Sequence, residues 1–163
     1  MNMPELRVLA AVPLIALAIA ACSTGTTSPS PAAASPSAAG GTGTTVAVAL
    51  QEWSVLPASN SVPTGSVTFQ VTNAGPADVH EFVVLKTDLD PGALPVDANG
   101  AVTEEGAGIE VVDEIEDVAV GATPELTVTL AAGKYVLLCN LSRDTEKEAH
   151  YKMGMRTAFT VTE

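Results

Sequence analysis

The residues best suited to metal chemistry are few, because the 163-residue chain has only two histidines, two cysteines and four methionines. His80 stands alone in the middle of the chain, whereas Cys139 and His150 lie near its end with ten residues between them. Met155 follows His150 after four intervening residues, and Met153 lies within that interval. Two imidazoles, a thiolate and a distant thioether form the ligand set of a type 1 copper site.

The scarcity of these side chains excludes larger metal sites. Two histidines cannot form a three-histidine zinc site, and two cysteines cannot form a four-thiolate zinc or iron–sulfur site. The formal net charge of −12 provides no basic stripe to neutralise phosphates, so we expect no binding to nucleic acid. If both histidines and Cys139 bind one ion and the other cysteine, Cys22, carries a lipid, neither residue type is left for a second site.

Each candidate ligand also has an ordinary interpretation. A histidine at a strand end is often a surface residue, a cysteine that ends an apolar strand is often a small buried hydrophobe, and methionines often fill a core. The combination favours a metal. If the protein is exported, the unpaired thiol of Cys139 faces a compartment that oxidises thiols, and a role as a buried metal ligand explains its presence there. A metal-free β-sandwich that serves as an interaction module stays open as the alternative.

The elements that must position these residues are short strands. Six segments show apolar alternation or a short apolar run, both of which are typical of strands. They are 46–50, 67–71, 82–85, 126–130, 135–138 and 159–161. Gly, Pro and Asn separate the segments, and 82–85 is apolar throughout, as expected of a strand covered on both faces. The pattern predicts an all-β fold, an antiparallel Greek-key β-sandwich of seven to eight strands.

The N-terminal part differs from the rest in composition. An apolar run over 8–21 is too short for a confident membrane span and precedes Cys22 in a pattern that resembles the bacterial lipoprotein box. The next residues are only Ser, Thr, Gly, Pro and Ala and cannot bury a core. We therefore expect a lipoprotein signal peptide over 1–21, a lipidated Cys22 with a flexible linker over 22–44, and one domain over 45–163.

Residues 45–163 resemble the cupredoxin family, the plastocyanin-like blue copper domains. The resemblance rests on an early His, then Cys, His and Met in one loop between the last two strands, with Gly154-Met155 before a Phe-Thr-Val strand. It implies that one copper ion, cycling between Cu(I) and Cu(II), is bound by a set of four residues. These are His80, Cys139, His150 and Met155, with Met153 as the alternative axial ligand.

The sequence departs from that family at two places. The ten residues between Cys139 and His150 form a longer loop than plastocyanins usually have. Glu81 follows the first histidine, where plastocyanins have an Asn that braces the two ligand loops. Its carboxylate either points outward or approaches the metal as a neighbour of the site.

The resemblance implies an electron carrier rather than an enzyme, because one saturated copper site leaves no open position for a substrate. It also implies that His150 is the edge at which electrons enter and leave. Storage or delivery of copper is the main alternative function. We expect an exported monomer that a lipid anchors at the outer face of the cytoplasmic membrane or in the periplasm.

Seven carboxylates gather between residues 104 and 117. Such a stretch is usually a solvated face that keeps the protein soluble. The alternative is a docking patch for a basic redox partner, because opposite charge speeds encounter at low salt. The sequence does not identify that partner protein.

Overall fold

Alternating apolar residues place most of the described chain in two β-sheets. The computed structural model describes residues 43–143 and 148–163. The first sheet has the order β2-β1-β4-β7, formed by β1 (Thr44–Gln51), β2 (Ser54–Pro57), β4 (Gly65–Asn73) and β7 (Glu125–Leu130). The second has the order β3-β11-β8-β5-β6, formed by β3 (Ser61–Pro63), β11 (Arg156–Thr162), β8 (Gly133–Leu138), β5 (His80–Lys86) and β6 (Glu110–Val118).

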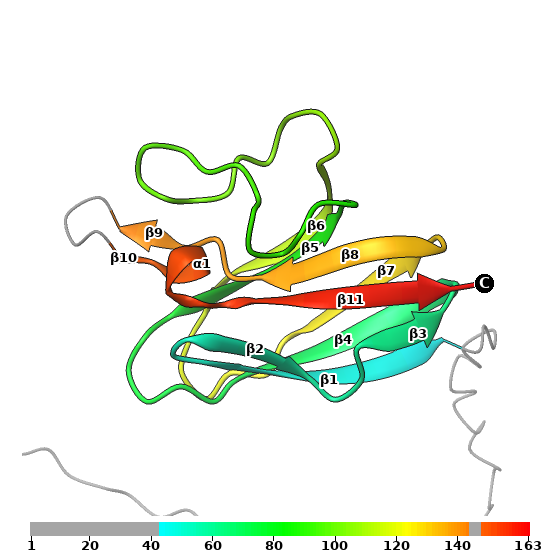
Figure 1. Ribbon diagram of the computed structural model, residues 1–163. Helices are drawn as coiled ribbons and strands as arrows, with labels where there is room; N and C mark the ends of the chain where they lie inside the picture. Colours follow the sequence, from blue (N-terminus) through cyan, green and yellow to red (C-terminus); the bar gives the residue numbers. More distant parts are fainter. Residues whose placement is uncertain (1–42, 144–147) are drawn as a thin grey trace, which may run out of the picture. The chain divides into compact units, whose positions relative to one another are not determined.

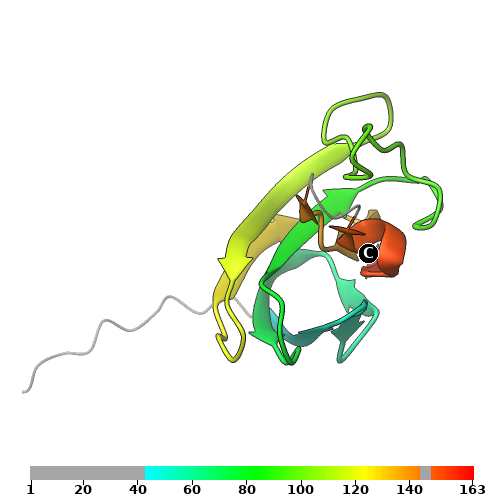
Figure 2. The same ribbon diagram turned by 90° about the vertical axis from the view of Figure 1, so that its left-hand side faces the viewer.

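Three short elements lie at one end of the sandwich, at the opposite end from the C-terminus (Figure 1). They are β9 (Ser142–Arg143), β10 (Glu148–Ala149) and the four-residue helix α1 (His150–Met153). In the view turned by 90°, the two sheets curve around the space between them (Figure 2). The predicted all-β sandwich is confirmed.

The pairing of the strands differs from the antiparallel prediction at two places. β1 runs parallel to β4, and β11 runs parallel to β3, while the other pairs within the two sheets are antiparallel. For the first pair the reason lies in the connection. After β1 and β2 the chain crosses to the second sheet as β3, and it then re-enters the first sheet as β4 in the direction of β1.

The core explains why the strand between 82 and 85 is apolar on both faces. Phe82 and Val84 belong to the main cluster, which joins both sheets and includes Phe69 and Phe159. Val83 and Leu85 face the other way, into a second cluster that contains Leu94, Val102 and Tyr151. Residues 88–109 therefore cover the outer face of the second sheet, and they contain one isolated bridge, Val96 to Val102, rather than a helix.

The predictions for the N-terminal segment fall mostly outside the described residues. The signal peptide over 1–21, the lipidated Cys22 and all but the last two residues of the linker over 22–44 belong to that part. Among the residues that are described, none forms a helix long and apolar enough to cross a membrane.

Candidate metal centre

Three separate segments bring the predicted ligands to one end of the sandwich. His80 is the first residue of β5, Cys139 directly follows β8, and His150 is the first residue of α1. The pairing of β5 with β8 brings His80 and Cys139 to the same sheet end, because Val83 lies opposite Leu138. The predicted positions of His80 and Cys139 at strand ends agree with the structure, whereas His150, expected in a loop, begins a short helix.

Backbone hydrogen bonds fold the last ligand segment against Cys139. The Cys139 N–H donates to the Met155 carbonyl at 3.0 Å, and the His150 N–H donates to the Leu141 carbonyl at 3.0 Å. The Met155 N–H donates back to the His150 carbonyl at 3.0 Å. These hydrogen bonds hold His150 and Met155 close to Cys139.

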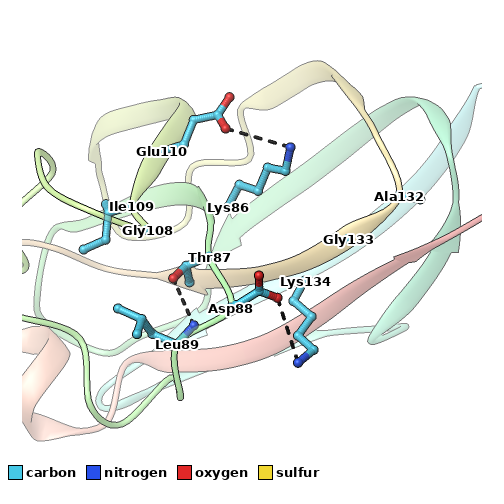
Figure 3. Close-up of a pocket in the computed structure, with 10 residues that line it drawn as sticks. All are labelled: Lys86, Thr87, Asp88, Leu89, Gly108, Ile109, Glu110, Ala132, Gly133 and Lys134. Atoms are coloured by element: carbon cyan, nitrogen blue, oxygen red, sulfur yellow. Dashed lines mark hydrogen bonds and ion pairs between the residues drawn. The ribbon is translucent and has the colours of Figure 1, made fainter.

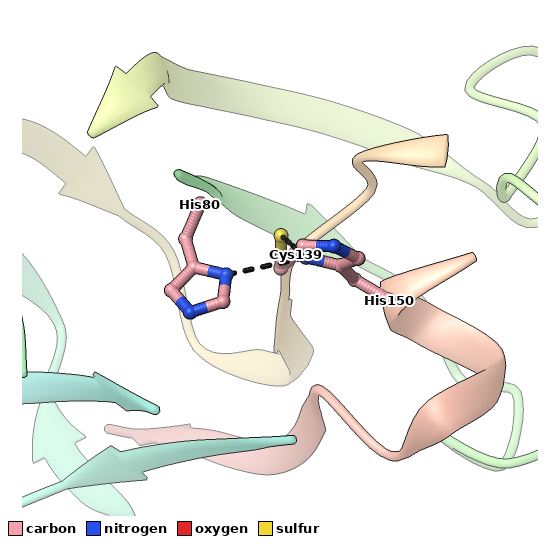
Figure 4. A group of neighbouring side chains, drawn as sticks. All are labelled: His80, Cys139 and His150. Carbon is pink, nitrogen blue, oxygen red and sulfur yellow. Dashed lines mark hydrogen bonds between the residues drawn. The ribbon is translucent and has the colours of Figure 1, made fainter. Parts of the chain in front are cut away.

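The side chains of His80, Cys139 and His150 point toward one another (Figure 4). Nδ1 of His80 lies 3.2 Å from Nδ1 of His150, and that same atom of His150 lies 3.4 Å from Sγ of Cys139. One donor atom from each residue lies within 4.8 Å of the others. Two nitrogens and one sulfur thus converge on a point that a single metal ion can occupy.

Burial controls the protonation of these three groups. Burial lowers the pKa of His150 to about 4, with a further lowering from the neighbouring His80. Burial also lowers the pKa of His80, although Glu52 and Asp78 oppose the change. Both imidazoles are therefore neutral near pH 7 and keep a lone pair for a metal. Burial raises the pKa of the Cys139 thiol to about 11, so a metal must displace its proton on binding.

The two methionine candidates have different surroundings. Met155 is 0% exposed and packs in the same core cluster as Cys139. Met153 is 41% exposed at the end of α1. A weak axial thioether has to come from a buried side chain next to the other ligands, which favours Met155 over Met153.

Glu81 contributes to the site through its backbone. Its N–H donates to Sγ of Cys139 at 3.2 Å, which stabilises negative charge on the sulfur. Its carboxylate instead groups with those of Glu114 and Glu116. Burial and the nearby carboxylates Glu114, Glu104 and Glu116 raise the pKa of Glu81 to about 7. Of the two orientations left open by the sequence, the structure has the one directed away from the ligand atoms.

Asn73 braces the segment that leads to His80, which is a different role from that of the plastocyanin Asn between the two ligand loops. Its Nδ2 donates to the carbonyls of Asp78 and Val118 at 2.8 Å each, and its Oδ1 accepts from the N–H of Gly75 at 3.0 Å. The side chain is buried and ties the segment before His80 to the ends of β4 and β6. The Asn-Ala-Gly-Pro sequence signalled only a turn here.

Two further neighbours of the histidines were not found from the sequence. Oε1 of Glu52 lies 4.0 Å from Nε2 of His80. The ring of Trp53 meets the ring of His150 edge to face, with 5.0 Å between the centroids. His150 itself is 0% exposed, so its ring is not open to solvent, and the entry and exit of electrons at His150 stays a prediction. The side chain of Trp53 is only partly buried and lies against that ring.

A hollow of about 470 Å³ lies away from the ligands and is lined by residues 86–89, 108–110 and 132–134 (Figure 3). Nζ of Lys86 lies 3.9 Å from Oε2 of Glu110, and Nζ of Lys134 lies 3.9 Å from Oδ1 of Asp88. Each lysine in this hollow is thus already next to a carboxylate. The candidate ligands do not line it, so the metal centre is a closed cluster of side chains rather than an open pocket.

The donor set fits a soft, redox-active metal. A buried thiol and two neutral imidazoles suit copper, and the buried Met155 is close in sequence to His150. The other imidazole nitrogens, Nε2 of His80 and of His150, are buried and have no hydrogen-bond partner among the described residues. They lie on the far side of each ring from the converging Nδ1 atoms, so a metal bound at Nδ1 would not supply their partner.

Comparison with solved structures places this architecture among known folds. The model matches reduced auracyanin from the photosynthetic bacterium Roseiflexus castenholzii, with a TM-score of 0.50 and 23% identity over 76% of this chain and 98% of that one. The chain has the cupredoxin fold. Auracyanin B matches with a TM-score of 0.50 and 21% identity over 74% of this chain and 89% of its own.

A third cupredoxin with the same score is auracyanin A, described as a "blue" copper protein from the green thermophilic photosynthetic bacterium Chloroflexus aurantiacus. Its identity is 17% over 74% of this chain and 99% of that one. No protein-family model matches the sequence, and no curated protein sequence matches it. At these identities the likeness shows the fold, and the function has to be argued from the site.

Proposed function

We propose that this cupredoxin-fold protein binds one copper ion with His80, Cys139, His150 and Met155 and carries single electrons. The observation that carries the proposal is the convergence of two imidazole nitrogens and a thiol sulfur within 4.8 Å at a fully buried position. Copper bound there would supply one-electron redox chemistry. The auracyanins that share the fold include one described as a "blue" copper protein.

The chain's own contribution is a rigid and dry cage. Strands β5 and β8 fix two of the ligands, and backbone hydrogen bonds on either side of α1 fix the other two. Because the packed core holds these side chains in place, the ligand geometry changes little when the metal changes its oxidation state. A small rearrangement favours fast electron transfer over release of the ion.

We infer that electrons reach His150 through the surface formed by Trp53, because the imidazole is buried and the indole ring lies against it. The acidic residues between 104 and 117 support a basic partner protein, since all of them except Glu114 are exposed. Charge of one sign on this scale accelerates encounter with an oppositely charged partner at low salt. An ionic-strength series of the electron-transfer rate with a basic and with an acidic redox protein tests this.

We also propose that the protein works outside the cytoplasm on a lipid anchor at Cys22, followed by a linker over 22–44. The lipobox-like sequence before Cys22 and the uncharged linker composition support this. Labelling with a radioactive fatty acid, with Cys22→Ser as the control, tests the anchor. Label retained by the Cys22→Ser variant, or absent from the wild type, would contradict it.

Electron transfer and copper delivery are separated by one experiment on the copper-loaded protein. An electron carrier keeps its ion through repeated cycles of reduction and oxidation when a competing Cu(I) chelator is present. A delivery protein hands the reduced ion to the chelator within the first cycle. We expect retention, because all four proposed ligands are fully buried.

A further inference from the structure

Glu52 is an acidic residue in the turn between β1 and β2 whose carboxylate lies against the back of His80. Its side chain is only 13% exposed, and Oε1 lies 4.0 Å from Nε2 of His80. Nδ1 of the same ring faces His150 and Cys139, so the carboxylate and the metal position lie on the two opposite nitrogens of one imidazole.

The carboxylate is held in this place by the segment that leads to His80. The N–H groups of Ala77 and Asp78 donate to Oε1 at 3.2 Å and 2.9 Å. Residue 75 is a glycine, and a Cβ added there would lie 2.5 Å from Oε2, so the carboxylate would have to move. Gly75 thus leaves room for the carboxylate, and the N–H groups of Ala77 and Asp78 favour its charged form because they donate to Oε1.

In the described part of the chain, Glu52 and His80 each keep one unpartnered polar atom next to this contact. Oε2 of Glu52 and Nε2 of His80 are buried atoms that have no hydrogen-bond partner among the described residues. A distance of 4.0 Å is longer than a hydrogen bond, so the pair is in electrostatic contact and closes with a movement of about 1 Å. A buried carboxylate favours a proton on the nitrogen that faces it.

We infer that Glu52 is a positioning residue that holds the proton of His80 on Nε2, so that Nδ1 presents its lone pair to the metal, and that its charge favours the oxidised ion. This rests on the proposed copper site. The same arrangement assigns the protons in the metal-free protein: Nδ1 of His80 accepts a hydrogen bond from Nδ1–H of His150, across the 3.2 Å that separates them.

Two measurements on the full chain, purified in detergent, test the inference. The first uses the metal-free wild type and reads the tautomer of each histidine from its ring nitrogen shifts in two-dimensional NMR. We expect the Nε2–H form for His80 and the Nδ1–H form for His150. A proton on Nδ1 of His80 would overturn the inference, and this result does not depend on copper binding or on any variant.

The second measurement compares reduction potentials of the copper-loaded wild type and the Glu52→Gln variant. Glutamine keeps the shape of the side chain and an oxygen for the N–H groups of Ala77 and Asp78, and it removes the charge. We expect the ratio of Cu(II) to Cu(I) affinity to fall about tenfold, which raises the potential by about 59 mV. An unchanged potential in a variant that still binds copper would overturn the inference.

The matched control is Glu125→Gln, the same substitution at an exposed carboxylate on β7 that accepts a hydrogen bond from Gln70. Its potential should equal that of the wild type. If Glu52→Gln and Glu125→Gln shift the potential equally, net charge rather than position is responsible, and the inference fails. If the wild type does not bind copper, the proposed function fails, while the tautomer of His80 still decides the role of Glu52.

Discussion

Replacing Asn73 by leucine should destabilise the protein by about 3 kcal/mol, although Asn73 is not a proposed ligand. The carboxamide makes three hydrogen bonds, to the carbonyls of Asp78 and Val118 and from the N–H of Gly75. Each such bond contributes about 1 kcal/mol net, so the three together give about 3 kcal/mol. Leucine keeps the branched shape of the side chain and leaves no cavity, but it is larger, so any overpacking adds to the loss.

The buried location of Asn73 makes this a lower estimate. The side chain is 1% exposed, so Val118 and Asp78 would lose their partner where water cannot easily replace it. A buried polar group left without a partner costs about 1–3 kcal/mol. Three groups lose their partner, the carbonyls of Asp78 and Val118 and the N–H of Gly75, so the loss should be at least about 3 kcal/mol.

Urea unfolding of the metal-free protein measures the effect. With an m-value of about 2 kcal/mol/M, a loss of about 3 kcal/mol lowers the midpoint by about 1.5 M. The control is Asn99→Leu, because Asn99 is exposed, and it should change the free energy of unfolding by less than about 0.5 kcal/mol. A loss below about 1 kcal/mol for Asn73→Leu, or one equal to that of the control, would refute the bracing role.

Three further predictions concern the surroundings of the site. Gly75→Ala should lower the free energy of unfolding in urea by about 1–3 kcal/mol, because the new Cβ would meet the Glu52 carboxylate at 2.5 Å. Most of that loss should vanish when Glu52 is also replaced by alanine. An equal loss in both backgrounds would contradict the contact. Met155→Leu should raise the reduction potential of the copper-loaded protein because it removes the buried thioether, whereas the exposed Met153→Leu should not; the reverse pattern would make Met153 the axial ligand. Burial and neighbouring carboxylates raise the pKa of Glu114, so its ionisation in the folded state lowers the stability of the protein. Glu114→Gln should therefore stabilise the protein at pH 7. The gain should disappear below the ordinary carboxyl pKa, where both the Glu and the Gln side chain are neutral. A gain that is the same at pH 7 and at pH 3 would contradict this.

The sequence predicts the strands whose apolar residues alternate or run together. The segments 67–71 and 126–130 lie within β4 and β7, and the two-sided burial of 82–85 agrees with its apolar run. β6 was not among the predicted strands, because its residues are largely acidic and only its pairing with β5 makes it a strand. Short-range alternation carries information about one strand, whereas the choice of partner depends on contacts far along the chain.

The candidate ligands could be found because their residue types are rare and chemically distinct. Their supporting residues could not, because Glu52 and Asn73 act through hydrogen bonds and contacts whose partners no local pattern indicates. The burial of His150 could not be predicted either, because its position between the last two strands indicates only a loop. It follows instead from the packing of Trp53, a residue that lies almost a hundred positions earlier in the chain.

The most direct test of the account is the visible spectrum of the purified protein after addition of Cu(II), with Cys139→Ser as the paired variant. We expect an intense blue band from charge transfer between the Cys139 thiolate and the metal, and its loss in Cys139→Ser, because serine offers no soft sulfur donor. A wild type that retains no copper, or a band of equal intensity in Cys139→Ser, would contradict the proposed site.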